Sequence, residues 1–188
     1  MFENPENLPL SLSPLAWMIG RWQGWGVLTG ESDKALVQEI RTDIVGEHMR
    51  MVTTLYFGEA TADVPAELSA KDGLDIIKPG ELFREETSYW RVATPLAAVP
   101  SEDESPKELA LTSSGTDGFS VLWVGAALGP RITLATDVIA RQSGAPEVDR
   151  MTRMYGLVAG ELMWTTDRTI QGGEPEIELT GRLMRVTN

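Results

Sequence analysis

From residue 20 onward, stretches with strand-like composition alternate with short turn signals, and this spacing is the feature that most constrains the fold. The clearest turns are Gly46-Glu47, Gly115 to Gly118, Gly129-Pro130, Ala159-Gly160 and Gln171 to Pro175. Connections this short join antiparallel neighbours, because a parallel pair needs a crossover of a dozen or more residues. The pattern therefore predicts an all-β chain built mainly from hairpins.

We expect about ten strands, preceded by a short helical turn over residues 12–19 that Ser13-Pro14 opens. We expect residues 58–80 to form a connection between strands, long enough to contain a short helix. We expect residues 94–106 to form an exposed loop. Up-and-down order over this many strands favours an antiparallel β-barrel, because closure removes the free sheet edges. A β-sandwich is the alternative that the pattern leaves open. The predicted strands cover residues 21–28, 34–45, 48–57, 82–93, 108–114, 118–128, 131–140, 149–158, 161–170 and 176–187.

Composition narrows the classes of protein further. The chain has 188 residues, of which 42% are hydrophobic, and this suits a single domain, residues 1–188, with a sizeable core. It has no cysteine, so disulfides, thiolate zinc sites and Fe–S clusters are excluded. A net charge of −12 disfavours nucleic acid as a partner. Neither a secretory signal nor an apolar run of membrane-spanning length is evident, so we expect a cytoplasmic protein without a membrane partner.

The most specific local pattern is Gly-x-Trp-x-Gly-x-Gly, formed by Gly20, Trp22, Gly24 and Gly26 on the first predicted strand. Glycine at alternate positions leaves one strand face bare, which permits close approach of another backbone or of a ligand. Trp22 lies on this same face and can fill the base of a barrel. An architectural role for Trp22 is the alternative, with Arg185 or Arg182 of the last strand as its cation–π partner.

Three segments together carry a family resemblance, because they occur in the right order and spacing: the glycine-tryptophan motif, residues 84–92 and residues 179–185. They resemble nitrobindins, haem-binding barrels that are related in shape to fatty-acid-binding proteins and lipocalins. The similarity extends over nearly the whole chain, with residues 58–80 as the poorest match. It implies a barrel of about ten strands with a pocket at one mouth, a haem held by a histidine of the last strand, and a homodimer.

The chain departs from the family at the site itself. Glu178 stands where the resemblance places the haem-ligating histidine, directly before Leu179, and Arg84 stands where some members have a second histidine. The only histidine, His48, lies far from the motif position. A carboxylate is not among the usual axial ligands of haem. We therefore predict that the protein binds no cofactor and no metal. Met184 and Tyr155 are the remaining residues whose side chains are of a type that can ligate haem iron.

Strand alternation predicts the lining of the altered pocket. Glu178, Thr180, Arg182 and Met184 share one face if the last strand is regular. A buried carboxylate needs a partner, and Arg84 and Arg182 are the candidates for an ion pair with Glu178. The alternative is that Glu178 is a solvated residue of the rim.

Three functions follow from these observations. The first is a binding module for a small apolar or amphipathic ligand, in which a cavity arginine suits a carboxylate head group. The second is the haem-dependent peroxynitrite isomerisation that the resemblance implies, with a different axial ligand. The third is a closed barrel that serves as an interaction surface. Metal-free catalysis lacks a recognisable constellation, since Glu85 and Glu86 are adjacent on a strand and point to opposite faces.

Overall fold

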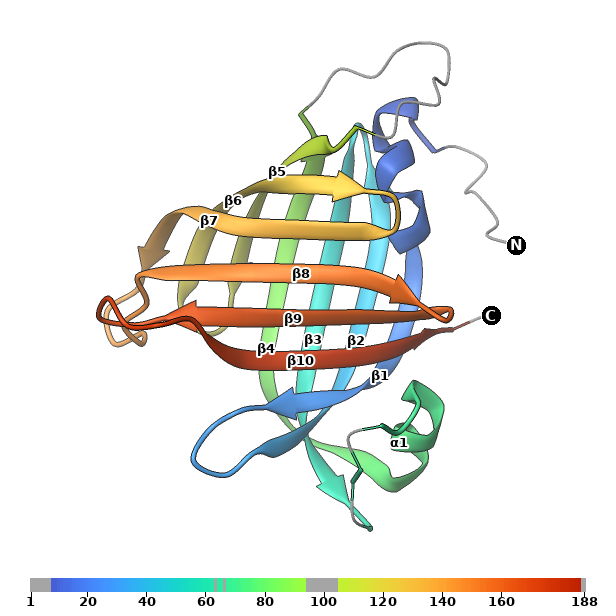
Figure 1. Cartoon of the computed structure of the whole chain (residues 1–188), viewed down its shortest axis with the longest axis vertical. Coiled ribbons are helices and arrows are strands. Elements are labelled where there is room, and N and C mark those ends of the chain that lie inside the picture. Colours follow the sequence, from blue (N-terminus) through green and yellow to red (C-terminus); the bar gives the residue numbers. More distant parts are fainter. Residues whose placement is uncertain (1–7, 63, 66, 94–104, 187–188) are drawn as a thin grey trace.

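The computed structural model describes residues 8–62, 64–65, 67–93 and 105–186, and its ten antiparallel strands close into a barrel (Figure 1). Neighbours around the barrel follow the order β1-β10-β9-β8-β7-β6-β5-β4-β3-β2. The prediction of an antiparallel barrel is confirmed, and the sandwich alternative is wrong. The elements are η1 (Leu10–Met18), β1 (Gly20–Leu28), β2 (Lys34–Val45), β3 (His48–Ala60), α1 (Ala70–Ile76), β4 (Ile77–Val92), β5 (Lys107–Gly115), β6 (Phe119–Leu128), β7 (Arg131–Arg141), β8 (Arg150–Val158), β9 (Glu161–Thr169) and β10 (Glu176–Arg185).

The excursion after β3 is shorter than the sequence predicts. β3 continues to Ala60 and β4 begins at Ile77, so that Gly58 lies opposite Pro79 and Ala60 opposite Ile77. This part of β4 pairs with β3 alone, because the pairing with β5 begins only at Glu86. A proline is tolerated there because no second neighbour needs its missing N–H. The predicted loop over residues 94–106 lies outside the described residues except for its last two positions.

One end of the barrel is plugged by η1. Its apolar side chains Leu12, Leu15 and Met18 are fully buried in the core. The Met18 carbonyl accepts hydrogen bonds from Trp22 Nε1 at 3.0 Å and from the Thr42 hydroxyl at 2.8 Å. The plug is therefore fastened to the start of β1 and to β2, and the chain enters the barrel wall from inside one end.

The glycines of the motif allow β10 to cross β1 closely. A Cβ atom on Gly24 would lie 2.0 Å from the Arg182 carbonyl oxygen, and one on Gly26 would lie 1.9 Å from the Thr180 carbonyl oxygen. Of the two arginines considered for Trp22, Arg185 holds its guanidinium 4.3 Å from the ring centroid. The same guanidinium donates to the carbonyl of Trp17 at 2.6 Å and to that of Ile19. The motif thus joins the first strand, the last strand and the plug.

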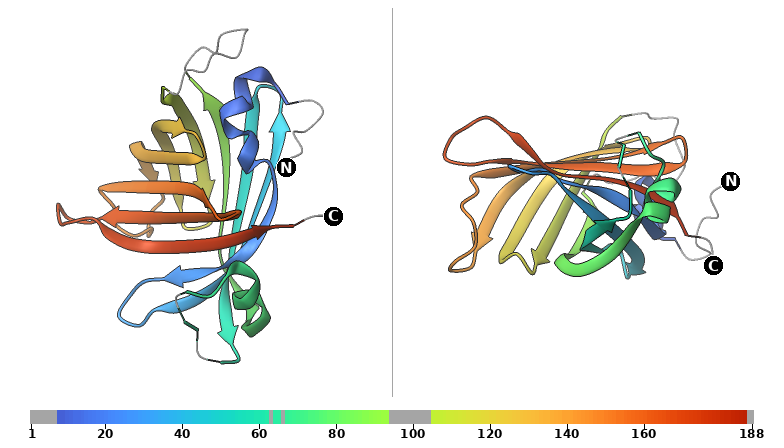
Figure 2. Two further views of the ribbon diagram at one scale, coloured as in Figure 1. Left: turned by 45° about the vertical axis from the view of Figure 1, so that its right-hand side comes forward. Right: turned by 90° about the horizontal axis from the view of Figure 1, so that it is seen from below.

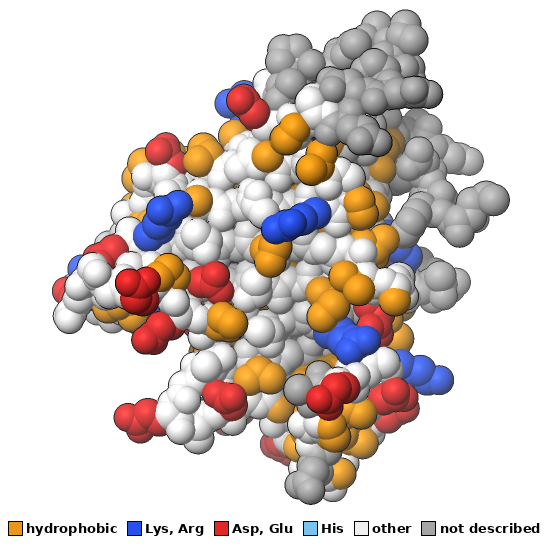
Figure 3. Space-filling view, viewed as in Figure 1, with side chains coloured by type: hydrophobic (Ala, Val, Ile, Leu, Met, Phe, Trp, Pro, Cys, Tyr) orange, Lys and Arg blue, Asp and Glu red, His pale blue; other side chains and the backbone are white. Residues whose placement is uncertain are grey.

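Helix α1 lies outside the barrel, beside β1 and β10 (Figure 2). The Ser69 hydroxyl caps it by accepting from the Asp72 backbone N–H at 3.1 Å. The ring of Trp25, on the outer face of β1, packs against Gly73, where a Cβ would lie 2.0 Å from the ring. Neither helix in the described residues is long and apolar enough to cross a membrane. Carboxylate side chains gather at the borders of the face in Figure 3, in keeping with the net charge of −12.

Candidate functional site

An alternating network of charges occupies the end of the barrel opposite η1. Glu178 of β10 lies between two arginines, with its Oε1 2.7 Å from Arg84 Nη2 and its Oε2 2.8 Å from Arg168 Nε. Asp117, in the turn between β5 and β6, bridges the same two arginines through Oδ2 at 3.3 and 3.5 Å. Two cations and two anions therefore balance, and we call these four residues the mouth network.

A β-bulge turns Glu178 toward this network. Ile177 lies opposite Asp167 and Leu179 opposite Thr166, so that Glu178 is the extra residue of β10. The alternation that we predicted for the last strand is therefore wrong at this point. Glu178 reaches the arginines inside the barrel end, whereas the even-numbered residues that follow it face outward.

The outward direction of these residues removes them from the predicted pocket. Arg182 forms an ion pair of 2.5 Å with Glu161 and donates to the Glu67 carbonyl near α1 at 3.2 Å. Thr180 accepts from the Val27 backbone N–H at 3.3 Å. Met184 lies opposite Gln23 of β1. Of the two arginines considered for Glu178, the structure brings Arg84 to it and not Arg182.

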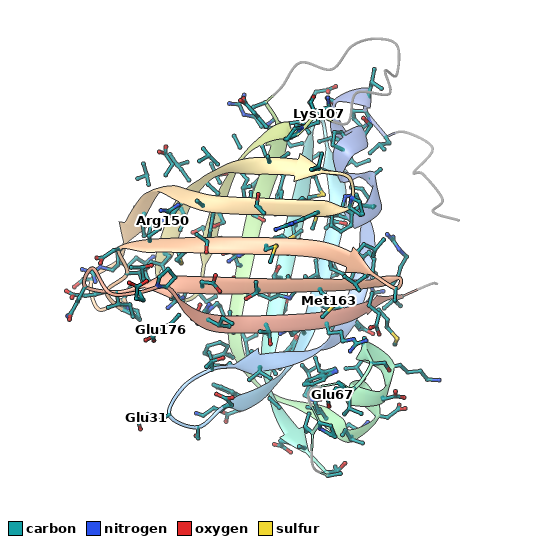
Figure 4. The ribbon with its side chains drawn as sticks, in the orientation of Figure 1. Glu31, Glu67, Lys107, Arg150, Met163 and Glu176 are labelled. Carbon is teal, nitrogen blue, oxygen red and sulfur yellow. The ribbon has the colours of Figure 1, made fainter. Side chains whose placement is uncertain are left out.

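The mouth network is largely shielded from water and bordered by aromatic rings. The Glu178 side chain is 12% exposed and that of Arg84 is 11% exposed, so a solvated rim position does not describe Glu178. Three cations lie over phenylalanine rings: Arg84 over Phe83 at 4.9 Å, Arg168 over Phe119 at 5.3 Å and Lys34 over Phe57 at 5.2 Å. Figure 4 labels Glu176 and Arg150 at this end, where β10 and β8 begin.

Burial acts on the ionisation of Arg168. It lowers the pKa of this guanidinium below its usual value, while the carboxylates of Glu178 and Asp117 act in the opposite direction. The neighbouring cation Arg84 adds to the lowering. Two arginines brought this close together depend on the two carboxylates between them.

A second ionic pair lies deeper in the barrel, and we call it the inner pair. The Nη1 of Arg153 on β8 lies 2.6 Å from the Oε1 of Glu86 on β4, and its Nε donates to the Thr166 hydroxyl at 3.0 Å. Its guanidinium lies 4.7 Å from the ring centroid of Trp123 and 5.6 Å from that of Trp164. The arginine of the inner pair is thus packed against two aromatic rings.

The inner pair is electrostatically matched. Burial alone would raise the pKa of Glu86, but the charge and the hydrogen bonds of Arg153 outweigh it and lower the pKa. Burial raises the pKa of the Tyr155 hydroxyl, which accepts a long hydrogen bond of 3.5 Å from Arg153. Arg153 in turn is held charged, because the Glu86 carboxylate outweighs the effect of burial and raises its pKa.

Sequence reasoning missed Arg168, Asp117 and the inner pair. A signal for the inner pair exists, since Arg153 stands at an inward position between the apolar residues Met151 and Tyr155. A charge at such a position asks for an opposite charge across the barrel. The sequence gives no comparable signal for Asp117. It lies in a predicted hairpin turn, where aspartate is a common residue for reasons of backbone conformation alone.

The only histidine of the chain is remote from both ionic layers. His48 begins β3 and borders a hollow on the outer surface together with Tyr89 and Arg91. Within the described residues, no group of three or more His, Cys, Asp or Glu side chains could hold a metal ion.

Comparison with known proteins agrees with this architecture. Residues 11–185 match the family model of the THAP4-like, heme-binding beta-barrel domain. The chain therefore belongs to the nitrobindin family of β-barrels.

Individual relatives extend over the whole chain. The "Ferric nitrobindin-like protein" of Kineococcus radiotolerans is 34% identical over 96% of both chains, and the "Peroxynitrite isomerase" of Leifsonia xyli subsp. xyli is 30% identical over 98% of this chain and 99% of its own. The crystal structure of Rv2717c from M. tuberculosis superposes with a TM-score of 0.71 at 21% identity, covering 96% of this chain and 100% of the other. That last likeness shows the fold alone.

The donors at the mouth do not fit a haem iron. Both carboxylate oxygens of Glu178 lie within ion-pair distance of an arginine, and an iron would have to compete with these cations. The two guanidinium groups carry no free electron pair for a metal. The other two residues that could ligate iron, Tyr155 and Met184, do not lie at the mouth. Tyr155 is in contact with the inner pair, and Met184 lies on the outer face.

Proposed function

We propose that this protein is a haem-free, single-domain barrel of the cytoplasm that binds a small amphipathic molecule with an anionic head group at the mouth. The observation that carries the proposal is the ion pairing of Glu178 with Arg84 and Arg168 inside the barrel end. Glu178 stands at the position where the family resemblance expects histidine, and its oxygens are committed to arginines. The protein therefore keeps the family's barrel and gives its mouth a different chemistry.

The chemistry of the mouth favours an anionic head group on an apolar body. Arg84 and Arg168 offer planar, multidentate donors that match a carboxylate. The rings of Phe83 and Phe119, which lie against these guanidinium groups, offer apolar contact beside the charge. This pairing of a cation with an aromatic face is suited to an amphipathic carboxylate.

Asp117 is the member of the mouth network that such a ligand would replace. Its contacts to Arg84 and Arg168, at 3.3 and 3.5 Å, are longer than those of Glu178. It also lies in a turn, and its side chain is 20% exposed. A ligand carboxylate that takes its place keeps the charge balance of the network, while Glu178 stays between the arginines.

Calorimetric titration with decanoate tests the proposal, with decylamine and decanol as head-group controls. We expect decanoate to bind more tightly than either control. Arg168→Gln should weaken decanoate binding about tenfold, which corresponds to about 1.4 kcal/mol. Asp117→Asn should strengthen it, because the competing carboxylate is gone. Equal affinity for all three probes, or no binding of decanoate by either the wild type or Asp117→Asn, would contradict the proposed ligand class.

A second candidate is the activity for which several relatives are named, peroxynitrite isomerase, with a haem held by a different residue. The observation in its favour is similarity over nearly the full chain to proteins of that name, at 30% identity. Two observations weigh against this activity. Both carboxylate oxygens of Glu178 form ion pairs with arginines, and neither Tyr155 nor Met184 lies at the mouth.

A further inference from the structure

A cleft opens on the outside of the barrel, where the segment after β3 folds back over β1 and β2. The β1–β2 hairpin and the end of β3 both project downward from the barrel in Figure 1. The pairing of β2 with β3 ends at Leu36 and Phe57, and β3 continues to Ala60 paired with β4 alone. Val64 of the following segment packs in one apolar cluster with Trp25 of β1. The space left between these elements has a volume of about 720 Å³.

The lining of this cleft is mainly apolar and combines aromatic rings with small side chains. Trp25 and Phe57 contribute the rings, and Val64 contributes an aliphatic side chain. The small residues of the lining are Ala35, Gly58 and Ala60. Side chains this small leave the wall close to the level of the backbone, so a planar molecule fits against it better than a branched one. The volume is within the range of about 300–1,000 Å³ that is typical of small-molecule sites.

The aromatic side of the cleft is held in place by α1. The indole N–H of Trp25 donates to the Ser69 carbonyl at 3.1 Å, and the ring packs against Gly73. The helix is fastened to the barrel in turn, because Glu161 of β9 accepts from the Ala70 backbone N–H at 2.8 Å. A wall that is already in place lowers the cost of ordering the site when a ligand binds.

Lys34 supplies a positive charge to the cleft. It borders the cleft at the start of β2, and its ammonium nitrogen lies 5.2 Å from the ring centroid of Phe57. Lys34 forms no ion pair among the residues that the structure describes. Asp33 also borders the cleft, but it accepts a hydrogen bond from the Gly30 backbone N–H at 3.2 Å within the hairpin turn. A cation beside an aromatic face suits an anionic group on an aromatic body.

The cleft is distinct from the mouth network. Phe57 separates the two sites: its ring lies 4.9 Å from that of Phe83, beside Arg84 of the mouth, and it also lines the cleft. Part of the cleft belongs to residues 58–80, the segment that resembles the nitrobindins least. The cleft is therefore a feature of this chain rather than a part of the barrel mouth.

We propose that this cleft is a second binding site, for a small molecule with a planar aromatic body and one anionic group. The aromatic body packs against Trp25 and Phe57, and the anionic group pairs with Lys34. The proposal does not depend on the ligand proposed for the mouth.

A fluorescence titration with anilinonaphthalene sulfonate tests the site, with uncharged phenylnaphthylamine as the matched probe. We expect the wild type to bind one sulfonate probe per chain in the cleft. Ala60→Phe places a ring in the cleft and should weaken the binding of both probes about tenfold. Lys34→Gln should weaken the sulfonate about fivefold, as the loss of an exposed ion pair does, and should leave phenylnaphthylamine unchanged.

Two control variants match these substitutions away from the cleft. Ala140→Phe adds the same ring at an exposed alanine of β7, and Lys71→Gln removes an exposed lysine of α1. Both should bind the sulfonate probe as the wild type does. Ala60 is exposed, so the thermal midpoint of Ala60→Phe should stay close to that of the wild type. Equal weakening by Ala60→Phe and Ala140→Phe would overturn the proposal.

Arg168→Gln locates the sulfonate probe relative to the mouth. If the probe lies in the cleft, neither this substitution nor saturating decanoate should alter its affinity. A probe that is weakened by Arg168→Gln and unaffected by Ala60→Phe lies at the mouth, and that result would overturn the cleft site. Absence of sulfonate binding by the wild type would overturn it as well. A failure of decanoate to bind contradicts the mouth ligand alone, because the cleft is scored with its own probes and variants.

Discussion

The inner pair and the mouth network are two ionic layers of one barrel, and they differ in how their charges are shared. Arg153 and Glu86 form an isolated couple beneath tryptophan rings, where each charge has one opposite charge as its main partner. At the mouth, four residues share their charges, and Asp117 is 20% exposed. The same chemistry serves stability in the inner pair, where each charge has one main partner, and in the proposed function it serves recognition at the mouth, where one member can be exchanged.

The largest expected effect is the loss of one charge from the inner pair. Arg153→Met should reduce the free energy of unfolding by about 3–5 kcal/mol, because it leaves the largely shielded Glu86 carboxylate without its main partner. Arg84→Met at the mouth should cost less, about 1–2 kcal/mol, since Arg168 still compensates Glu178. Urea unfolding of both variants measures the difference. Equal losses would break the distinction between the two layers.

The inner pair should also dominate the acid sensitivity of the fold. The pKa of Glu86 is lowered in the folded state, so its contribution is fully present above the ordinary value of 4.5 and is lost as the pH falls through the lowered pKa. Unfolding free energies measured between pH 7 and pH 2 should therefore fall below pH 4.5 in the wild type. Glu86→Gln should be less stable at pH 7 and show a flatter profile. An unchanged profile would assign the acid sensitivity to other carboxylates.

Within the mouth network, the two carboxylates should differ in their effect on stability. Glu178→Gln should cost about 1–3 kcal/mol, because it removes a shielded anion from two arginines. Asp117→Asn should cost about 1 kcal/mol or less, because its ion pairs are longer and more exposed. Chemical denaturation at neutral pH and low salt ranks the two variants. The reverse order would contradict the view of Asp117 as the exchangeable member.

The smallest expected effect lies outside both layers and calibrates the comparison. Ala159 and Gly160 form the β8–β9 turn with positive φ at both positions, 51° and 86°. Asparagine tolerates this conformation better than alanine. Ala159→Asn should therefore raise the free energy of unfolding by about 0.5–1 kcal/mol without altering the acid profile. A loss of stability would show that the turn is held by contacts other than its backbone preference.

Much of the fold can be predicted from the sequence because its turns are local signals. Gly46 adopts a φ of 59° at the first position of its hairpin turn, as a type II′ connection requires. The start of β4 could not be predicted in the same way, because Pro79 and Gly80 are turn residues by composition and strand residues by tertiary pairing. The alternation of strands is reliable only where no bulge interrupts it.

The site could be predicted only in part, because it depends on a bulge and on contacts between distant strands. The ion pair of Glu178 with Arg84 follows from the need of a buried carboxylate for a cation. The bulge at Glu178 arises from the way β10 pairs with β9, and no residue pattern on β10 predicts it. Arg168 and Asp117 reach the site from β9 and from a turn, and their convergence is a property of the closed barrel.

The central claim is that arginine pairing has replaced iron ligation at Glu178, and an absorbance titration with ferric haem tests it most directly. The wild type should give no specific Soret shift, whereas Glu178→His should give one with a stoichiometry of one haem per chain. Glu176→His, which adds an exposed histidine two residues earlier on β10, should behave like the wild type. Tight, stoichiometric binding of haem by the wild type would contradict this claim and would favour the haem-dependent activity instead.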